Sequence, residues 1–274
     1  MWLFKTNKFT ASLVLHLLCL FLIIDSANAQ KNNQNQTFIN DVQAFKKQFA
    51  QYNALQPFSE SATDLIANKL EILTKLLMAI FENPAIRYQK PDELIKTEGL
   101  SVVFSPDRKL YLISFDAKTE GSFKESFTLL HGYSPSNNIF NEWLMDNEIP
   151  LASMFYDQID VLNANVGRYL LIGQARTCNW CISCHAMMLE IGEEELNWTE
   201  IAGFDGRESE LKELKWNSQT LQFTIAYEST LVGDDLLQTE IQTETIDRIY
   251  KIAETFVYKD DEFVLKSSTM ELVE

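Results

Sequence analysis

The chain has 274 residues, of which 46% are hydrophobic, 12% aromatic and 23% charged, with 9 Gly and 6 Pro. This balance excludes a collagen-like, low-complexity or multi-spanning membrane protein, and the length allows one large domain or two small ones. The 39 Asp and Glu residues outnumber the 23 Lys and Arg residues, and the formal charge of -16 opposes binding to nucleic acid or to anionic lipid.

The first 29 residues have the pattern of a secretory signal peptide. Lys5 and Lys8 precede an apolar run from Ala11 to Ile24, and Ala27-Asn28-Ala29 fits a cleavage site. The run is shorter than the ~20 residues that a membrane-spanning helix needs, and no second run of that length follows. We therefore expect residues 1–29 to be removed and the remainder to be periplasmic or secreted, without a membrane span.

Residues 30–97 are expected to form a polar leader and two helices. In each helical stretch, apolar residues at three- and four-residue steps form one stripe, as on the core-facing side of an amphipathic helix. The first stretch runs from about Phe38 to Leu55 and the second from about Thr63 to Phe81, where Asn83-Pro84 predicts the helix end. The stripe residues are Ile39, Val42, Phe45, Phe49 and Tyr52, then Ile66, Leu70, Leu73, Leu77 and Phe81.

Residues 98–274 are expected to form an antiparallel β-rich domain. Short β-like runs alternate with charged turns, and no internal repeat of fixed period is visible. Ser105-Pro106-Asp107-Arg108 predicts a hairpin, because Pro sets the first turn torsion and Asp bonds to the backbone; Lys259-Asp260-Asp261-Glu262 predicts the last one. The expected strands are Leu100–Phe104, Lys109–Phe115, Ser126–Tyr133, Leu151–Tyr156, Arg168–Ala175, Ala186–Ile191, Leu221–Tyr227, Ile246–Tyr258 and Phe263–Lys266.

Helices followed by strands predict an α+β fold. Two N-terminal helices would pack on an antiparallel meander, sandwich or open barrel. No Gly-, Pro- or Ser-rich linker separates residues 30–97 from residues 98–274, so one folded unit is expected.

The segment Gly99-Leu-Ser-Val-Val-Phe-Ser-Pro-Asp-Arg-Lys-Leu-Tyr-Leu-Ile-Ser-Phe-Asp116, with Asn83-Pro84 and Gly121, resembles a group of exported, uncharacterised bacterial proteins. The resemblance runs loosely from about Leu65 to Tyr227. It implies a helical N-terminal part and a β-rich remainder, and it implies no catalytic residues. The sequence departs from the group at Arg108, where such turns usually have Gly, and at Glu120, which interrupts a Gly pair.

Three cysteines after the signal peptide, Cys178, Cys181 and Cys184, adjoin His185. Cys181-Ile-Ser-Cys184-His185 matches the C-x-x-C-H pattern of c-type haem attachment, where two thioethers and an axial histidine hold the haem. Export agrees with that chemistry, and the resemblance to c-type cytochromes covers these five residues. Haem would require a helical segment, with His131 or a methionine as the second axial ligand.

Metal binding and dithiol exchange are two further interpretations of these cysteines. The three cysteines and His185 offer a Cys₃His set to zinc, but four ligands in eight consecutive residues leave little freedom to form a tetrahedron. Two overlapping C-x-x-C motifs allow dithiol exchange, although no thioredoxin-like βαβ pattern surrounds them. We therefore expect no metal site.

The interpretation that we favour is one structural disulfide and one free thiol. On an extended strand, residues i and i+3 lie ~10 Å apart, beyond the ~7 Å that a disulfide tolerates. A bridge therefore needs a turn, either at Asn179-Trp180 or at Ile182-Ser183. Such a short loop stiffens a turn more than it stabilises the fold.

No motif combines a nucleophile or a metal set with a positioned base at a recognisable spacing. His131 and Ser134 lie close in sequence, but no nucleophile-elbow pattern surrounds the serine. We therefore expect an exported, non-enzymatic binding or structural module of unknown ligand and partner, without catalytic residues or cofactor. A c-type haem electron-transfer or redox protein is the alternative.

Overall fold

The structure, a computed structural model, describes residues 36–56, 60–118, 126–144, 154–193, 195–231 and 248–273. The predicted signal peptide, Gly121 and Glu120 lie outside these ranges. Among the helices described, none has the length and apolar character needed to cross a membrane.

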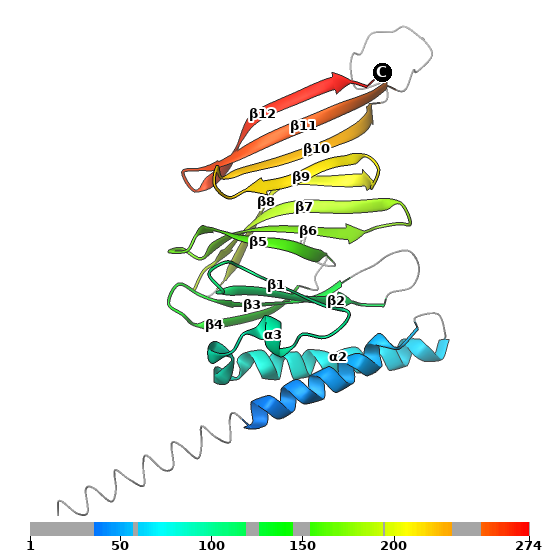
Figure 1. Cartoon of the computed structure of the whole chain (residues 1–274), viewed down its shortest axis with the longest axis vertical. Coiled ribbons are helices and arrows are strands. Elements are labelled where there is room, and N and C mark those ends of the chain that lie inside the picture. The colour runs from blue at the N-terminus through cyan, green and yellow to red at the C-terminus, as the bar shows by residue number, and fades with distance from the viewer. Residues whose placement is uncertain are drawn as a thin grey trace, which may run out of the picture.

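Two helices form a layer at one end of the molecule, the helix over residues 36–53 and α2 (Glu60–Glu82), which lie side by side (Figure 1). The α2 helix ends before Asn83-Pro84, as predicted. The Asn83 side chain accepts a hydrogen bond from the Ala85 N–H and thereby begins a short 3-10 helix, η1 (Pro84–Tyr88). The four-residue helix α3 (Pro91–Leu94) follows.

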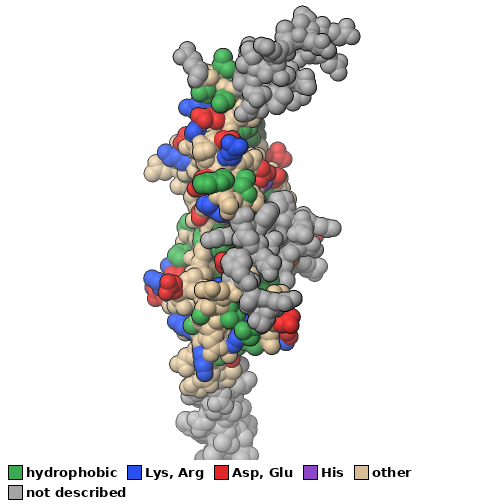
Figure 2. All heavy atoms as spheres, turned by 90° about the vertical axis from the view of Figure 1, so that its right-hand side faces the viewer, with side chains coloured by type: hydrophobic (Ala, Val, Ile, Leu, Met, Phe, Trp, Pro, Cys, Tyr) green, Lys and Arg blue, Asp and Glu red, His purple; other side chains and the backbone are tan. Residues whose placement is uncertain are grey.

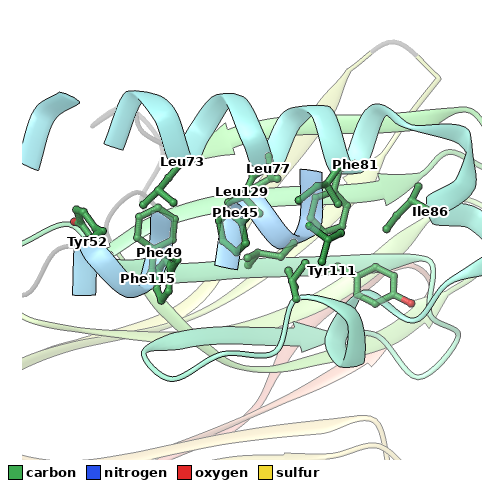
Figure 3. Packing of buried hydrophobic residues seen from close by; sticks show 14 of the residues in the cluster. Phe45, Phe49, Tyr52, Leu73, Leu77, Phe81, Ile86, Tyr111, Phe115 and Leu129 are labelled. Carbon is green, nitrogen blue, oxygen red and sulfur yellow. The ribbon is translucent and has the colours of Figure 1, made fainter. Parts of the chain in front are cut away.

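The apolar stripes of both helices face the first sheet (Figure 3). In the first helix the stripe begins at Phe38, which is buried, whereas the predicted Ile39 is 46% exposed. The buried positions then follow alternating steps of four and three, which keeps them on one side of the helix and turns Ile39 away. The buried residues of the two helices are Phe38, Val42, Phe45, Phe49, Tyr52, Ile66, Leu73, Leu77, Ile80 and Phe81.

The described strands form three four-stranded antiparallel sheets, each a meander, which confirms a mixed α+β fold that is mostly β. Sheet A contains β1 (Leu100–Phe104), β2 (Leu110–Asp116), β3 (Ser126–Tyr133) and β4 (Ile139–Leu144). Sheet B contains β5 (Phe155–Asn163), β6 (Arg168–Arg176), β7 (Cys181–Ile191) and β8 (Leu196–Arg207). Sheet C contains β9 (Leu211–Asn217), β10 (Gln222–Leu231), β11 (Arg248–Lys259) and β12 (Glu262–Leu272).

The hairpin between β1 and β2 turns at Ser105–Lys109, and that between β11 and β12 at Asp260–Asp261, as predicted. The predicted strand Leu151–Tyr156 overlaps β5 only at Phe155 and Tyr156, and its residues 151–153 lie outside the described ranges. Three further strands, β4, β8 and β9, were not predicted. Each carries charged or amide side chains between its apolar residues, as in the β9 sequence LKELKWN, so the apolar run that marked the other strands is missing.

The three sheets repeat one structural unit along the chain. Their first strands begin at Leu100, Phe155 and Leu211, which are 55 and 56 residues apart. The sequence shows no matching repeat. The environments of the sheets differ, because sheets A and B are covered on both faces, whereas the core residues of sheet C lie on one face. Equivalent strands therefore need different side chains.

The molecule is a stack of layers with an apolar core between each pair (Figure 1). One core lies between the helices and sheet A, a second between sheets A and B, and a third between sheets B and C. Strand β2 shows the consequence, since six of its seven residues are buried and successive side chains enter different cores. Figure 2 shows the stack from the side, with acidic and basic side chains intermixed along it.

Burial has the clearest electrostatic effect at His131 on β3. Its ring is fully buried on the helical side of sheet A, beside Phe81, and Nδ1 lies 2.7 Å from Asn141 Oδ1. Removal from water disfavours the imidazolium and lowers the pKa from 6.5 to about 4. The neutral imidazole is therefore part of the folded state.

The depressed pKa of His131 predicts acid sensitivity. The pKa of His131 is lower in the folded than in the unfolded protein, so protonation of His131 favours unfolding. The stability that depends on neutral His131 is therefore fully present above about pH 6.5 and is lost as the pH falls to about 4. We expect the free energy of unfolding to fall by up to about 1.4 kcal/mol per pH unit in that window from this residue. In His131→Gln, the free energy of unfolding from urea titrations at pH 7, 5.5 and 4 should fall less with decreasing pH than in the wild type. An equal fall in both proteins would contradict the role given to His131.

Candidate functional site

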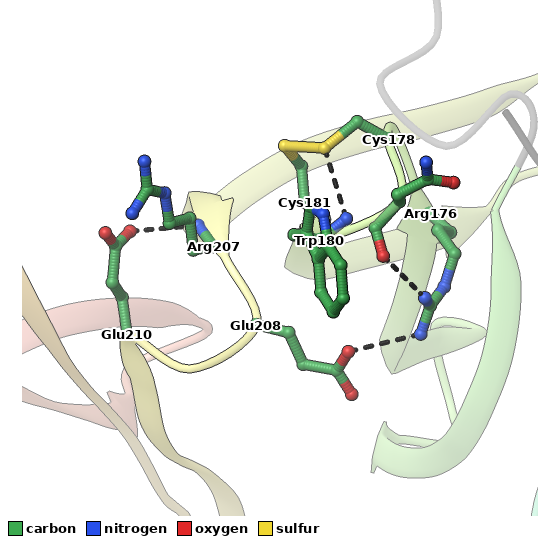
Figure 4. The surroundings of a disulfide bond; sticks show 8 residues. Arg176, Cys178, Trp180, Cys181, Arg207, Glu208 and Glu210 are labelled. Carbon is green, nitrogen blue, oxygen red and sulfur yellow. Dashed lines mark hydrogen bonds and ion pairs between the residues drawn. A yellow bond between two sulfur atoms is a disulfide. The ribbon is translucent and has the colours of Figure 1, made fainter. Parts of the chain in front are cut away.

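The cysteine cluster lies at the hairpin between β6 and β7. Cys178 and Cys181 form a disulfide across Asn179-Trp180, with their Cα atoms 4.7 Å apart (Figure 4). The backbone turns here, and the Thr177 N–H donates to the Cys181 carbonyl at 3.1 Å. The first of the two predicted turn positions is therefore the one that is bridged. Closing so short a loop stabilises the chain by about 2 kcal/mol at most in the chain-entropy model.

Cys184 is the free thiol, and it is 1% exposed. Its side chain lies in the core between sheets B and C, with Ile182 and Ala186. Burial, with the nearby charges of Asp157, Asp205 and Glu208, raises the pKa of this thiol to about 11. A protonated thiol without access to solvent is inert to exchange and to metal binding.

The residues of the C-x-x-C-H motif do not fit a covalent haem in this geometry. Cys181 is bonded to Cys178, and the segment is a strand instead of the helix that haem would require. Cys184 and His185 are adjacent on that strand and so point to opposite faces. His131, the predicted second ligand, faces the helices on the far side of sheet A. The described residues contain no group of three His, Cys, Asp or Glu side chains arranged for a metal ion.

His185 instead joins two strands of sheet B. Its Nε2 lies 2.8 Å from Ser183 Oγ and its Nδ1 lies 2.5 Å from Glu200 Oε1 on β8. Asp205 Oδ1 is 3.7 Å from Nε2. Gly203, opposite His185 in the register, leaves room for the ring, because a Cβ there would lie 2.6 Å from Nδ1. The contacts of Ser183, Glu200 and Gly203 were not predicted, because these residues meet only through the register of β7 and β8.

This serine–histidine–glutamate chain has the hydrogen-bond order of a catalytic triad, but its setting does not support acyl transfer. Ser183 is 8% exposed, and it is paired with Ala175 on one side and Asp205 on the other. The backbone N–H groups of an inner strand are used by its neighbours, so they are not available to stabilise an oxyanion. We therefore interpret these contacts as structural.

A second cluster lies where η1 and α3 meet the turns of sheet A. A cleft of about 520 Å³ is lined by residues from η1, the β1–β2 turn, β2, β3 and the turn after β3. The lining includes three basic residues and two tyrosines and no carboxylate. The lining residues are Ile86, Arg87, Gln89, Pro91, Arg108, Lys109, Tyr111, Tyr133 and Asn137.

The basic side chains of this cleft, which we name the cationic cleft, are held in different ways. Arg87 donates from Nη2 to the Asn137 carbonyl at 2.9 Å, and its guanidinium lies over the Tyr133 ring. Arg108 pairs with Asp92 at 2.8 Å and lies 4.3 Å from the centre of the Phe104 ring. Each guanidinium keeps further N–H donors.

Lys109 is the third cation of the cleft. Its ammonium has no hydrogen-bond or ion-pair partner among the residues that the structure describes. The cleft therefore presents uncompensated positive charge in a chain whose formal charge is -16.

The backbone of the cationic cleft is strained at two positions. Arg108 and Asn137 have φ angles of 56° and 65°, in the left-handed region. For arginine this conformation costs about 1 kcal/mol, and glycine adopts it freely. The arginine position therefore keeps a side chain at the expense of backbone strain, a pattern that is concentrated at functional sites.

Cys184 should be unreactive in the folded protein. Iodoacetamide at pH 8 should leave it unmodified, because the thiol is buried and its pKa is about 11. In denaturant, the protein without residues 1–29, and so without Cys19, should gain one alkylation by intact mass, and Cys184→Ser should remove it. Alkylation under native conditions would show that the core between sheets B and C opens.

Gly203→Ala should displace the His185 ring. The new Cβ would meet Nδ1 at 2.6 Å and Glu200 Oε1 at 2.7 Å, so both hydrogen bonds of the imidazole would be disturbed. We expect the free energy of unfolding to fall by about 1–3 kcal/mol, as measured by urea titration. In a His185→Ala background the same change should cost much less; equal costs would contradict the contact.

Searches against protein-family models, curated proteins and solved structures give no match for this chain.

Proposed function

We propose that this chain is an exported, non-enzymatic binding module that takes a small organic anion in the cationic cleft. The observation that carries the proposal is a cleft whose lining has no carboxylate and contains Arg87, Arg108 and Lys109, of which Arg108 is paired with Asp92 behind it. Export is expected from the sequence of residues 1–29. A volume of about 520 Å³ lies within the usual range of small-molecule sites.

The chemistry of the lining favours a phosphate or carboxylate joined to a flat ring. Guanidinium groups match the planar oxygen geometry of carboxylates and phosphates, and a lysine adds a point charge. Tyr111 and Tyr133 supply ring faces and hydroxyl groups in the same cleft. Burial raises the pKa of both tyrosines, so neither adds a negative charge at neutral pH.

The strongly acidic character of the whole chain does not oppose such a ligand once it is bound. At physiological ionic strength, exposed charges beyond about 8 Å are largely screened. The three cations of the cleft act within a few ångströms of the ligand, where screening is weak. The net charge instead disfavours long polyanions, whose phosphates would extend over the acidic surface.

Binding of small anions tests this function. We expect phenyl phosphate to bind more tightly than inorganic phosphate in calorimetric titrations, because the tyrosine rings contact the phenyl group. Arg108→Gln should weaken binding about tenfold, which corresponds to one charge-assisted hydrogen bond. Arg176→Gln, outside the cleft, is the matched control and should change affinity less than about twofold. Absence of binding up to about 5 mM ligand, or equal losses in both variants, would contradict the proposal.

Arg108→Gly separates binding from stability. Glycine relieves the left-handed strain but removes the guanidinium, so we expect stability to stay within about 1 kcal/mol while binding weakens about tenfold, as in Arg108→Gln. Asp260→Gly, at a turn residue with φ of 52° outside the cleft, should leave binding unchanged. A clear fall in stability without a change in binding would assign Arg108 a purely structural role.

A further inference from the structure

The Cys178–Cys181 disulfide lines a second cleft, which is separate from the cationic cleft. This disulfide cleft has a volume of about 800 Å³ and lies between the β6–β7 loop and the β8–β9 turn. Both cysteines line it, together with Trp180, which is 76% exposed. The sulfur atoms are therefore accessible to a thiol reagent, in contrast to the buried Cys184 (Figure 4).

The fold does not depend on this bond. Nine residue pairs, from Arg168 with Glu190 to Arg176 with Ile182, connect β6 and β7. Their side chains enter the cores on both faces of sheet B, which fixes the register without a covalent link. The disulfide closes a sequence separation of three residues, so reduction frees a turn and leaves the sheet intact.

The nearest polar neighbours of the disulfide come from Arg207 and Trp180. Arg207 lies directly opposite Cys181 in the register of β7 and β8, and its guanidinium has no ion-pair partner among the described residues. Directly opposite residues share a face of the sheet, with Cβ atoms about 5 Å apart. At the other sulfur, the Trp180 N–H donates to Cys178 Sγ at 3.3 Å.

Two further charges at the disulfide cleft compensate each other, whereas the Glu210 carboxylate has no ion-pair partner among the described residues. Glu208 pairs with Arg176 at 3.1 Å, and Arg176 also donates to the Asn179 carbonyl. The Glu210 carboxylate accepts a hydrogen bond from the Arg207 backbone N–H. The Arg207 guanidinium is thus the unpaired cation beside the disulfide among the described residues, and Figure 4 shows it on the side of Glu210, turned away from the two sulfur atoms.

We propose that Cys178–Cys181 is a thiol–disulfide exchange site for an external dithiol. A thiolate of the dithiol attacks Cys178 Sγ, an S–S bond forms between the two molecules, and the Cys178–Cys181 bond breaks. Cys181 leaves as a thiolate opposite Arg207. The second thiolate of the reductant then attacks the mixed disulfide, so that the dithiol is oxidised by two electrons and both cysteines become thiols after protonation. Cys184 takes no part.

The test begins with the purified oxidised protein and dithiothreitol as the dithiol. We expect about 1 mM reagent to reduce the bond in the folded protein, read as two maleimide additions by intact mass while the circular dichroism spectrum stays unchanged. Diamide should restore the oxidised mass. Arg207→Gln should slow reduction roughly threefold or more, because the unpaired positive charge beside the disulfide is lost, and Arg207→Lys should stay near the wild-type rate.

Two results would overturn the proposal. One is reduction that requires denaturant, which would make the bond a purely structural staple. The other is Arg207→Gln reduced at the wild-type rate, which would remove the assigned role of the cation. Neither result bears on anion binding in the cationic cleft, and failure of that binding leaves the exchange site unaffected.

Discussion

Sheets A and B each bury both of their faces, and the rest of the structure depends on this constraint. A strand in such a sheet must supply apolar side chains in both directions, as the buried run of β2 does. At about 25 cal/mol per Å² of apolar surface removed from water, three stacked cores supply the dominant stabilising contribution. The helices serve the same constraint, since they cover the outer face of sheet A.

Polar groups inside such a stack are tolerated only when they satisfy one another. Ser114 and Thr128 are buried and hydrogen-bonded across β2 and β3. His131 is neutral and meets Asn141, because an imidazolium would be too costly at that depth. The Ser183–His185–Glu200 contacts follow the same rule closer to solvent. The buried polar side chains described here therefore form hydrogen bonds that hold neighbouring strands together.

The groups that remain available to a ligand lie where the layers end, in turns and short helices. Both clefts have this character. The cationic cleft combines the turns of sheet A with η1 and α3, and the disulfide cleft combines two turns at the end of sheets B and C. A rigid stack positions these segments accurately while they stay accessible, which is the usual division between scaffold and functional loop. The same rigid stack holds Arg108 in its strained, left-handed backbone conformation.

The sequence by itself determined the local features. The apolar stripes determined the helices, apart from the offset between Ile39 and Phe38, and Asn83-Pro84 and Ser105–Arg108 determined a helix end and a turn. These succeed because cap, turn and periodicity rules act over a few residues. The sequence left the bridged turn open between Asn179-Trp180 and Ile182-Ser183, and the structure places it at the first. Only the tertiary structure decided that three meanders stack, that β4, β8 and β9 pair, and that Glu200 meets His185. It also brought Arg87 to Arg108, 21 positions later, because a cleft depends on the packing of elements whose separation along the chain leaves no local signal.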